Sequence, residues 1–233
     1  MRDETPEEFS ARRDAMKAQI NALDKDQVGT VPERKQFFES VYDMADGDEA
    51  AVPWADLKPK PQLSAWLAAN PGGGARAIDI ACGLGDNAEA LAAAGYATTA
   101  FDLSQKAVDW AKRRFPESKV DYCAANLMEP PSGWTGSFDL VHECYTIQSV
   151  PPSMHADFSR AIAALVAPGG RLLVYTRLRA ENSAVEGPPW PLMPSESGIF
   201  RTLGFVPESR SQFDLERPDR IIPHEFSVWR KMG

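Results

Sequence analysis

Residues 77–88 read AIDIACGLGDNA, an apolar run that ends in two closely spaced glycines and then turns polar. Such a run, with Gly83 and Gly85 at its end, predicts a buried strand, a tight turn and the start of a helix. The stretch fits the loose form G-x-G-x-x-A of the dinucleotide-binding fingerprint, and an acid, Asp102, follows 19 residues after Gly83. A bound nucleotide or related ligand is therefore expected at this turn.

The sequence around this turn alternates between strand and helix patterns. Apolar runs at 75–82, 97–103, 119–125, 138–144 and 171–177 predict strands, and helical patterns lie between the first three and after the fourth. This alternation indicates a parallel sheet with helices on both faces. After a helix near 195–203, the runs 209–216 and 221–231 predict a hairpin. We therefore predict an α/β fold with a doubly wound, Rossmann-like sheet, mostly parallel and closed by a C-terminal antiparallel hairpin.

Three helical segments precede the sheet. Capping boxes at Thr5–Glu8 and Thr30–Glu33 start the first two, and the third ends before Asn70-Pro71. Their apolar residues recur at helical spacing: Phe9, Met16, Ile20 and Leu23; Phe37, Phe38, Val41 and Tyr42; and Leu63, Trp66 and Leu67. We expect one domain over 1–233, with residues 1–70 as a helical extension or lid and 71–233 as the Rossmann-like core.

The composition and charge of the chain restrict the kinds of partner that it can bind. The 233 residues are 43% hydrophobic and carry a net charge of −8, which suits a folded domain and disfavours a nucleic-acid backbone as the main partner. No apolar run approaches the roughly 20 residues of a membrane span. The acidic N-terminus lacks the pattern of a secretory signal, and the three cysteines lack metal-ligand spacing. We expect a cytoplasmic protein without a metal site, and its oligomeric state is left open.

Two acids at the glycine turn bear on the ligand. Asp79 lies inside the first predicted strand, four residues before Gly83, and would repel a pyrophosphate but attract an ammonium group. Asp86 occupies the helix start, where a phosphate would require bare backbone amides. A ligand with a zwitterionic amino-acid end and an adenosine end fits these residues better than a dinucleotide does.

Four stretches together resemble class I S-adenosylmethionine-dependent methyltransferases, over roughly residues 75–205. They are DIACGLG at 79–85, AFDLS at 100–104, FDLV at 138–141 and LVAPGGRLL at 165–173. More narrowly, VPW at 52–54 and GPPWPL at 187–192 look like the thiopurine and thiol/halide methyltransferase group. The resemblance implies S-adenosylmethionine as cofactor and S-adenosylhomocysteine as product.

The resemblance also implies roles for residues at the strand ends. Asp102 would accept both ribose hydroxyls, and Asn126 would lie near the adenine amino group. Leu103 and Leu127 would pack on the adenine faces, although each is equally plausible as core. The methionine end would meet the turn and two carboxylates, that is Asp79, Ala81, Cys82, Gly83, Gly85 and Glu143.

The acceptor is expected beside the end of the fourth predicted strand, where HECY occupies 142–145. His142 and Glu143 are the candidate bases and Tyr145 could orient the acceptor, although His142 could equally be a core histidine and Tyr145 could simply fill space. Trp54 and Trp190 could form an aromatic lid that binds the substrate, although filling of the core or surface is equally plausible for each.

We therefore predict an enzyme that moves a methyl group from S-adenosylmethionine to a small-molecule acceptor, such as a thiol or another soft nucleophile. A small-molecule O-methyltransferase is the alternative within the same class. An NAD-dependent oxidoreductase is the alternative from a different class, since the glycine turn alone would suit both.

Overall fold

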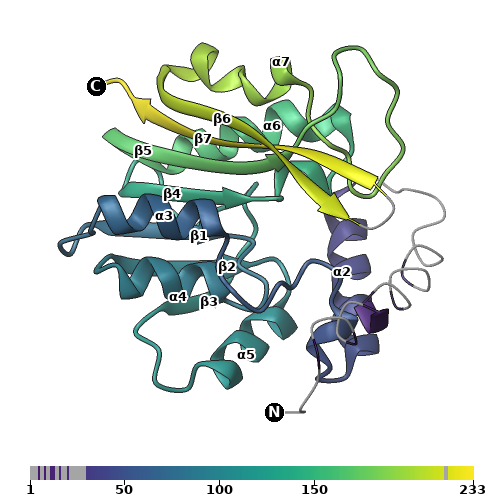
Figure 1. Ribbon diagram of the computed structural model, residues 1–233. Coiled ribbons are helices and arrows are strands. Elements are labelled where there is room, and N and C mark those ends of the chain that lie inside the picture. Colours follow the sequence, from purple (N-terminus) through teal and green to yellow (C-terminus); the bar gives the residue numbers. More distant parts are fainter. Residues whose placement is uncertain are drawn as a thin grey trace.

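The computed structural model describes residues 5, 8, 11–13, 16, 20, 30–217 and 220–233. Its centre is a seven-stranded sheet in the order β3-β2-β1-β4-β5-β7-β6 (Figure 1). The strands are β1 Arg76–Ile80, β2 Ala97–Asp102, β3 Asp121–Ala124, β4 Phe138–Cys144, β5 Val166–Arg177, β6 Phe205–Arg217 and β7 Arg220–Lys231. The first five are parallel, and β7 runs antiparallel to both β5 and β6. The predicted fold class is confirmed.

One boundary differs from the sequence prediction. The fifth strand was expected to begin at residue 171, but β5 already begins at Val166 and includes Pro168, Gly169 and Gly170. The pairing with β4 shifts register between Phe138 and Leu140, which lets the strand accommodate the two glycines as an irregularity rather than a loop.

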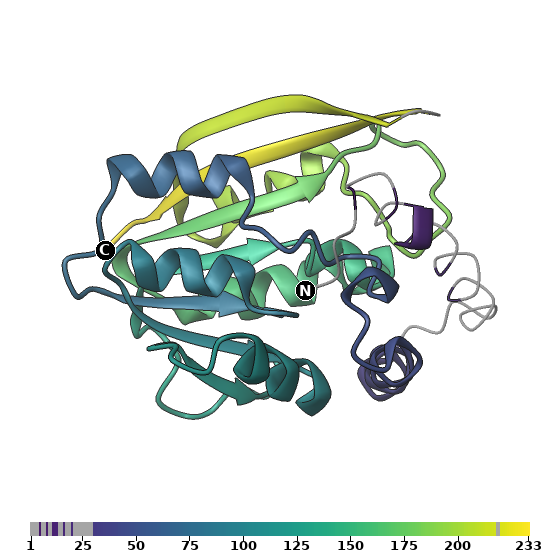
Figure 2. The same cartoon turned by 60° about the horizontal axis from the view of Figure 1, so that its bottom comes forward.

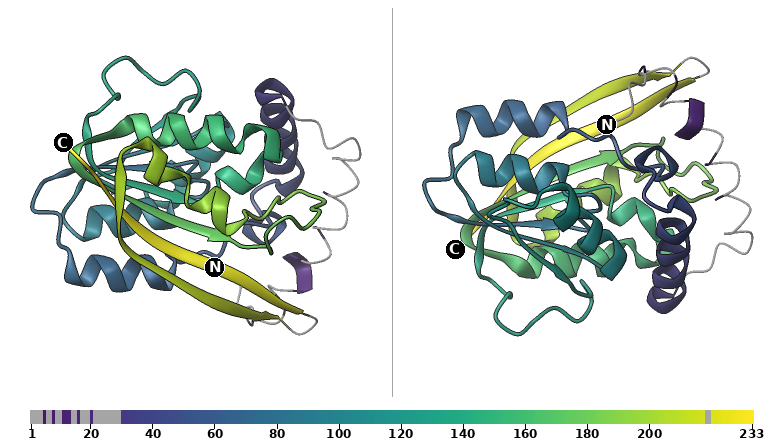
Figure 3. Two further views of the ribbon diagram at one scale, coloured as in Figure 1. Left: turned by 90° about the horizontal axis from the view of Figure 1, so that it is seen from above. Right: turned by 90° about the horizontal axis from the view of Figure 1, so that it is seen from below.

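Helices cover both faces of the sheet (Figure 3). The helical segments are α2 Val31–Ala45, η1 Glu49–Ala51, α3 Pro61–Ala69, α4 Asp86–Ala93, α5 Gln105–Arg114, η2 Ile147–Ser149, α6 Pro152–Leu165, α7 Pro194–Ser197 and η3 Ile199–Leu203. Leu63 and Leu67 of α3 and Leu91 of α4 pack on Ala77 and Leu140 on one face. Ser104 caps the N-terminus of α5, since its Oγ accepts a hydrogen bond from the Ala107 N–H at 3.3 Å.

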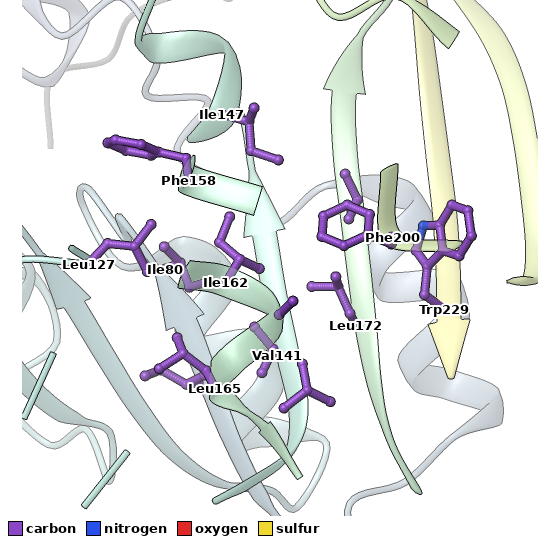
Figure 4. Packing of buried hydrophobic residues seen from close by; sticks show 14 of the residues in the cluster. Ile80, Leu127, Val141, Ile147, Phe158, Ile162, Leu165, Leu172, Phe200 and Trp229 are labelled. Carbon is purple, nitrogen blue, oxygen red and sulfur yellow. The ribbon is translucent and has the colours of Figure 1, made fainter. Parts of the chain in front are cut away.

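The largest core cluster lies on the opposite face, under α6 and η3. Ile80 and Val141 of the parallel strands meet Ile162 of α6 there, and the cluster continues to Phe200 and Trp229 (Figure 4). Trp229 is fully buried, and its indole N–H donates to Ser227 Oγ at 2.9 Å. The hairpin strand β7 is therefore part of the central core rather than an appendage.

Helix α2 lies beyond the ends of β1 and β2 (Figures 1 and 2). α2 begins after Thr30 with the expected capping box, and Lys106 of α5 forms ion pairs with Glu39 and Asp43 of α2. Of the first predicted helix, Phe9 and Leu23 lie outside the described residues, whereas Ile20 is buried. Among the helices that the structure describes, none combines the length and the apolar composition needed to cross a bilayer.

Gly85 of the glycine turn can be compared with Gly47, a glycine outside the turn, by replacing each with alanine. Gly85 has a φ of 93°, and a Cβ there would lie 2.5 Å from Tyr122 Oη, whereas Gly47 has a φ of 81° and open space around it. Gly47→Ala should cost about 1–2 kcal/mol through the left-handed backbone alone, and Gly85→Ala should cost about 1–3 kcal/mol more through overpacking. Urea unfolding of both variants measures the difference.

The clash itself can be tested separately. Tyr122 is buried and its hydroxyl donates to Glu89 Oε1 at 2.7 Å, so the ring cannot easily move aside. Tyr122→Phe removes the hydroxyl that a Cβ on residue 85 would meet. In the Tyr122→Phe background, the loss of unfolding free energy caused by Gly85→Ala should therefore come closer to that caused by Gly47→Ala. Equal losses for the two glycine variants would contradict this account of the turn.

Candidate active site

The glycine turn is built from left-handed backbone. Ala81, Gly83 and Gly85 have φ values of 50°, 52° and 93°, and α4 starts at the next residue. The turn is closed by the Gly85 N–H, which donates to the Cys82 carbonyl at 3.0 Å. A non-glycine residue at positive φ is strained, so Ala81 marks a point where the surrounding structure dictates the backbone.

Asp102 joins this turn to the next strand. It is the last residue of β2, and its Oδ2 accepts the Gly83 N–H at 3.0 Å while its Oδ1 accepts the Ser104 N–H at 2.9 Å. Burial raises the pKa of Asp102 to about 6, although the two backbone donors favour the charged form. Each carboxylate oxygen retains a lone pair for another donor.

Arg114 fixes the other side of the turn. Its guanidinium donates to the Leu84 carbonyl at 2.5 Å and to both carboxylate oxygens of Asp86, at 2.7 and 2.9 Å. Asp86 at the helix start is thus an ion-pair partner that holds the turn, a role that its sequence position alone did not reveal.

Asp79 and His142 face each other across β1 and β4. Their register pairs them directly, and His142 Nδ1 lies 2.7 Å from Asp79 Oδ1. Both side chains are buried, while Asp79 Oδ2 and His142 Nε2 have no hydrogen-bond partner. His142 has no exposed surface and is held by Asp79, which argues against its predicted role as the base that touches the acceptor.

Glu143 points to the other face of the sheet. Its Oε1 accepts the N–H groups of Thr146 and Ile147 at 2.6 and 3.1 Å, and its Oε2 is buried without a partner. Burial raises the pKa of Glu143 to about 7, and the nearby Asp79 adds to the shift. Unpaired buried acceptors are costly, so the two free carboxylate oxygens suit a cationic or hydrogen-donating ligand near the ends of β1 and β4.

The residues predicted for adenine lie at the ends of β2 and β3. Asn126 Oδ1 accepts the Met128 N–H at 3.0 Å in a local turn. Leu127 is buried in the core cluster with Ile80, whereas Leu103 is half-buried. Their contacts with a ligand remain predictions.

Trp54 and Tyr42 cover the glycine turn. The Trp54 indole N–H donates to Tyr42 Oη at 3.1 Å. A Cβ placed on Gly83 would lie 3.7 Å from the side chains of both residues. Trp54 therefore lies next to the glycine turn, where the cofactor is predicted to bind.

Trp190 lies in a different segment of the chain, between β5 and α7. Its side chain is nearly buried, with the residue only 3% exposed, and its backbone N–H donates to the Gln148 carbonyl at 2.7 Å. The Arg34 guanidinium of α2 lies 5.5 Å from the Trp190 ring and 5.1 Å from that of Phe38, which packs edge-on against Trp54. The two tryptophans are thus linked through α2 rather than stacked on each other, and Trp190 offers a substrate little free surface.

Tyr145 follows β4 with a φ of 66°. Its hydroxyl lies 2.8 Å from His224 Nε2, and His224 Nδ1 lies 2.7 Å from the Ile222 carbonyl. Nδ1 must donate to that carbonyl, so Nε2 is the acceptor and the Tyr145 hydroxyl is the donor. Burial lowers the pKa of His224 to about 4, which keeps the imidazole neutral.

Lys60 and Arg177 complete this group, and with His224 they were not anticipated from the sequence. The Lys60 ammonium lies 4.5 Å and the Arg177 guanidinium 5.6 Å from the centre of the Tyr145 ring. Arg177 ends a predicted strand, and that position was the one available signal. The described residues hold no cluster of three or more side chains that could bind a metal ion.

Residues 77–170 match the family model of a methyltransferase domain. The chain is 40% identical over 114 residues to the ubiquinone biosynthesis O-methyltransferase of Aromatoleum aromaticum, which covers 48% of each chain. It is 33% identical over 139 residues to that of Bordetella bronchiseptica, covering 56% of this chain and 57% of that protein. The chain thus spans about half the length of the curated relatives it matches.

Solved structures share the fold. Magnesium protoporphyrin IX methyltransferase from Synechocystis PCC 6803, with bound S-adenosylhomocysteine, has a TM-score of 0.65 at 16% identity, covering 85% of this chain and 99% of that one. A Burkholderia thailandensis 1,6-didemethyltoxoflavin-N1-methyltransferase, also with S-adenosylhomocysteine, has a TM-score of 0.62 at 22% identity, covering 86% and 87%.

Residues 77–170 thus match a methyltransferase domain, and the chain shares the fold of solved S-adenosylhomocysteine-bound methyltransferases. The prediction of fold is confirmed, and the predicted methyltransferase activity with S-adenosylmethionine as cofactor agrees with these comparisons. Both of these curated relatives are named as O-methyltransferases, which supports the O-methyltransferase alternative over the thiol acceptor and gives no support to an NAD-dependent oxidoreductase.

The raised pKa of Glu143 predicts a pH dependence of stability. Its carboxyl group binds a proton more tightly in the folded protein, so it destabilises the fold as pH rises from about 4.5 to 7. A shift of this size corresponds to about 3 kcal/mol. Glu143→Gln should therefore lose less unfolding free energy than wild type between pH 4.5 and 8, as measured by urea unfolding.

Glu208 offers a control of opposite sign. Its hydrogen bond with Arg171 lowers its pKa, so it titrates below this window and Glu208→Gln should keep the wild-type slope between pH 4.5 and 8. An unchanged slope in Glu143→Gln would show that this buried carboxyl does not titrate as described.

Proposed function

We propose that the protein transfers the methyl group of S-adenosylmethionine to an oxygen atom of a small-molecule acceptor. The observation that carries the proposal is the glycine turn between β1 and α4, held by the Asp102 carboxylate within the segment that matches the methyltransferase domain. A turn of this kind at the carboxyl ends of parallel strands is where α/β sheets bind their ligands.

The residues of the turn fit the cofactor. Asp102 has lone pairs left for the ribose hydroxyls, and the free oxygens of Asp79 and Glu143 suit the positively charged methionine end. When bound, S-adenosylmethionine supplies an electrophilic methyl group on a sulfonium. The protein's contribution is to orient the acceptor in line with that group and to keep water out, as Tyr42 and Trp54 can do from above the turn.

Oxygen is favoured over sulfur as the acceptor atom. The relatives at 33–40% identity are named O-methyltransferases. Of the two tryptophans in the stretches that resemble thiol methyltransferases, Trp190 is nearly buried. A hydroxyl must lose its proton as it attacks. The Tyr145–His224 pair can receive it, because Tyr145 can pass its own proton to the bare Nε2 of His224 while accepting the proton of the acceptor.

The N-terminal segment is assigned the role of a lid over this site. Tyr42 of α2 and Trp54 lie on the glycine turn and pack with residues of the Rossmann-like core. This packing supports the prediction that residues 1–70 and 71–233 form one domain. Greater loss of turnover than of folding on removal of residues 1–50 would support this role. The cytoplasmic location stays a prediction.

Substitution of Asp102 tests the cofactor site. Asp102→Ala removes charge-assisted hydrogen bonds to the ribose and should weaken S-adenosylhomocysteine binding by about 30- to 150-fold, with a milder effect for Asp102→Asn. Titration calorimetry measures both. Asp121→Ala, an exposed acid at the opposite end of the neighbouring strand β3, is the control. Unchanged affinity in Asp102→Ala would remove this residue from the site.

A paired acceptor assay tests the atom that is methylated. Catechol should be methylated on oxygen with a kcat/KM about tenfold or more above that of thiophenol, because the site presents groups arranged for a hydroxyl. Tyr145→Phe should lower the catechol rate by about 100-fold without weakening S-adenosylhomocysteine binding. Tyr96→Phe, whose hydroxyl binds the Asn70 carbonyl, is the control. Faster methylation of thiophenol would favour the thiol alternative.

A further inference from the structure

Arg177 is held at the edge of the sheet where the acceptor is expected. It is the last residue of β5 and lies directly opposite His224 of β7. Its backbone N–H donates to Gln148 Oε1 at 2.7 Å, and its carbonyl accepts the Leu192 N–H at 3.0 Å. The side chain therefore projects from a rigid strand end rather than from a loop.

The guanidinium of Arg177 has no polar partner within the part of the chain that the structure describes. The Nε atom is buried and makes no hydrogen bond, and the guanidinium lies over the face of the Tyr145 ring. Arg179, two residues later, shows the usual arrangement, since it binds Glu196 and the carbonyls of Pro191 and Ser183. A partly buried arginine without an acceptor is unusual, and it indicates a site that an anion can complete.

The surroundings of Arg177 are locally positive in a chain of net charge −8. Arg177, Lys60 and Arg217 all act to lower the pKa of His224, after the larger effect of burial. Asp56 is the acid that faces this group, and it is already paired with both Lys60 and Arg13. An anionic group at this edge would therefore meet an uncompensated cation.

We propose that the acceptor carries a carboxylate and that Arg177 binds it, with the reacting hydroxyl directed to the Tyr145–His224 pair. This inference rests on the proposed O-methyltransferase function and names the class of substrate, a hydroxylated carboxylic acid. The planar guanidinium matches a carboxylate in a two-bond contact. The carboxylate also offsets the positive charge that His224 gains when it takes the hydroxyl proton.

Two probes that differ only in the carboxylate test this assignment. 3,4-Dihydroxybenzoate should bind the complex of the protein with S-adenosylhomocysteine at least about tenfold more tightly than catechol does. Arg177→Gln should abolish that preference by weakening the binding of dihydroxybenzoate while leaving the binding of catechol unchanged. Arg177→Lys, which keeps the positive charge, should retain part of the preference. Titration calorimetry at saturating S-adenosylhomocysteine measures all six affinities.

The control is Arg230→Gln, at the other end of β7, where Arg230 lies near Glu208. It should keep the wild-type preference. Equal affinity of the wild type for the two probes, or an equal loss for both in Arg177→Gln, would overturn the assignment. Retained S-adenosylhomocysteine binding in those cases would leave the proposed function standing, whereas its absence in the wild type would reject that function instead.

Discussion

The hydrogen bond between the Gly83 N–H and the Asp102 carboxylate is the contact on which the rest of the site depends. It joins the turn after β1 to the end of β2, and the second oxygen of the same carboxylate fixes Ser104, the N-cap of α5. Two parallel strands and the helices that follow them are thereby aligned at one edge. This one side chain therefore ties the glycine turn to the start of α5.

Three carboxyl groups are buried at the same edge of the sheet, which is costly for the stability of a folded protein. Asp79, Glu143 and Asp102 are all buried, and burial raises the pKa of the last two. Arg114 neutralises only Asp86. Buried carboxylates with unpaired oxygens destabilise a fold, so their presence here is better explained by a cationic ligand than by packing.

Much of this arrangement follows from sequence, because strand ends and glycine turns have local signatures. Asp79, Asp102 and Glu143 were expected at the edge because each stands near the end of an apolar run. The opposite faces of His142 and Glu143 follow from strand alternation, but the pairing of His142 with Asp79 depends on register between β1 and β4. His224 could not be foreseen, because its approach to Tyr145 is created by antiparallel pairing between segments far apart in the chain.

The most direct test of the central claim is a calorimetric titration of the wild-type protein with S-adenosylhomocysteine and, separately, with NADH. Both ligands contain adenosine, and they differ in the part that is expected to lie near Asp79 and Glu143. The acidic edge should bind S-adenosylhomocysteine and reject the pyrophosphate of NADH. Tight binding of NADH with none of S-adenosylhomocysteine would contradict the account.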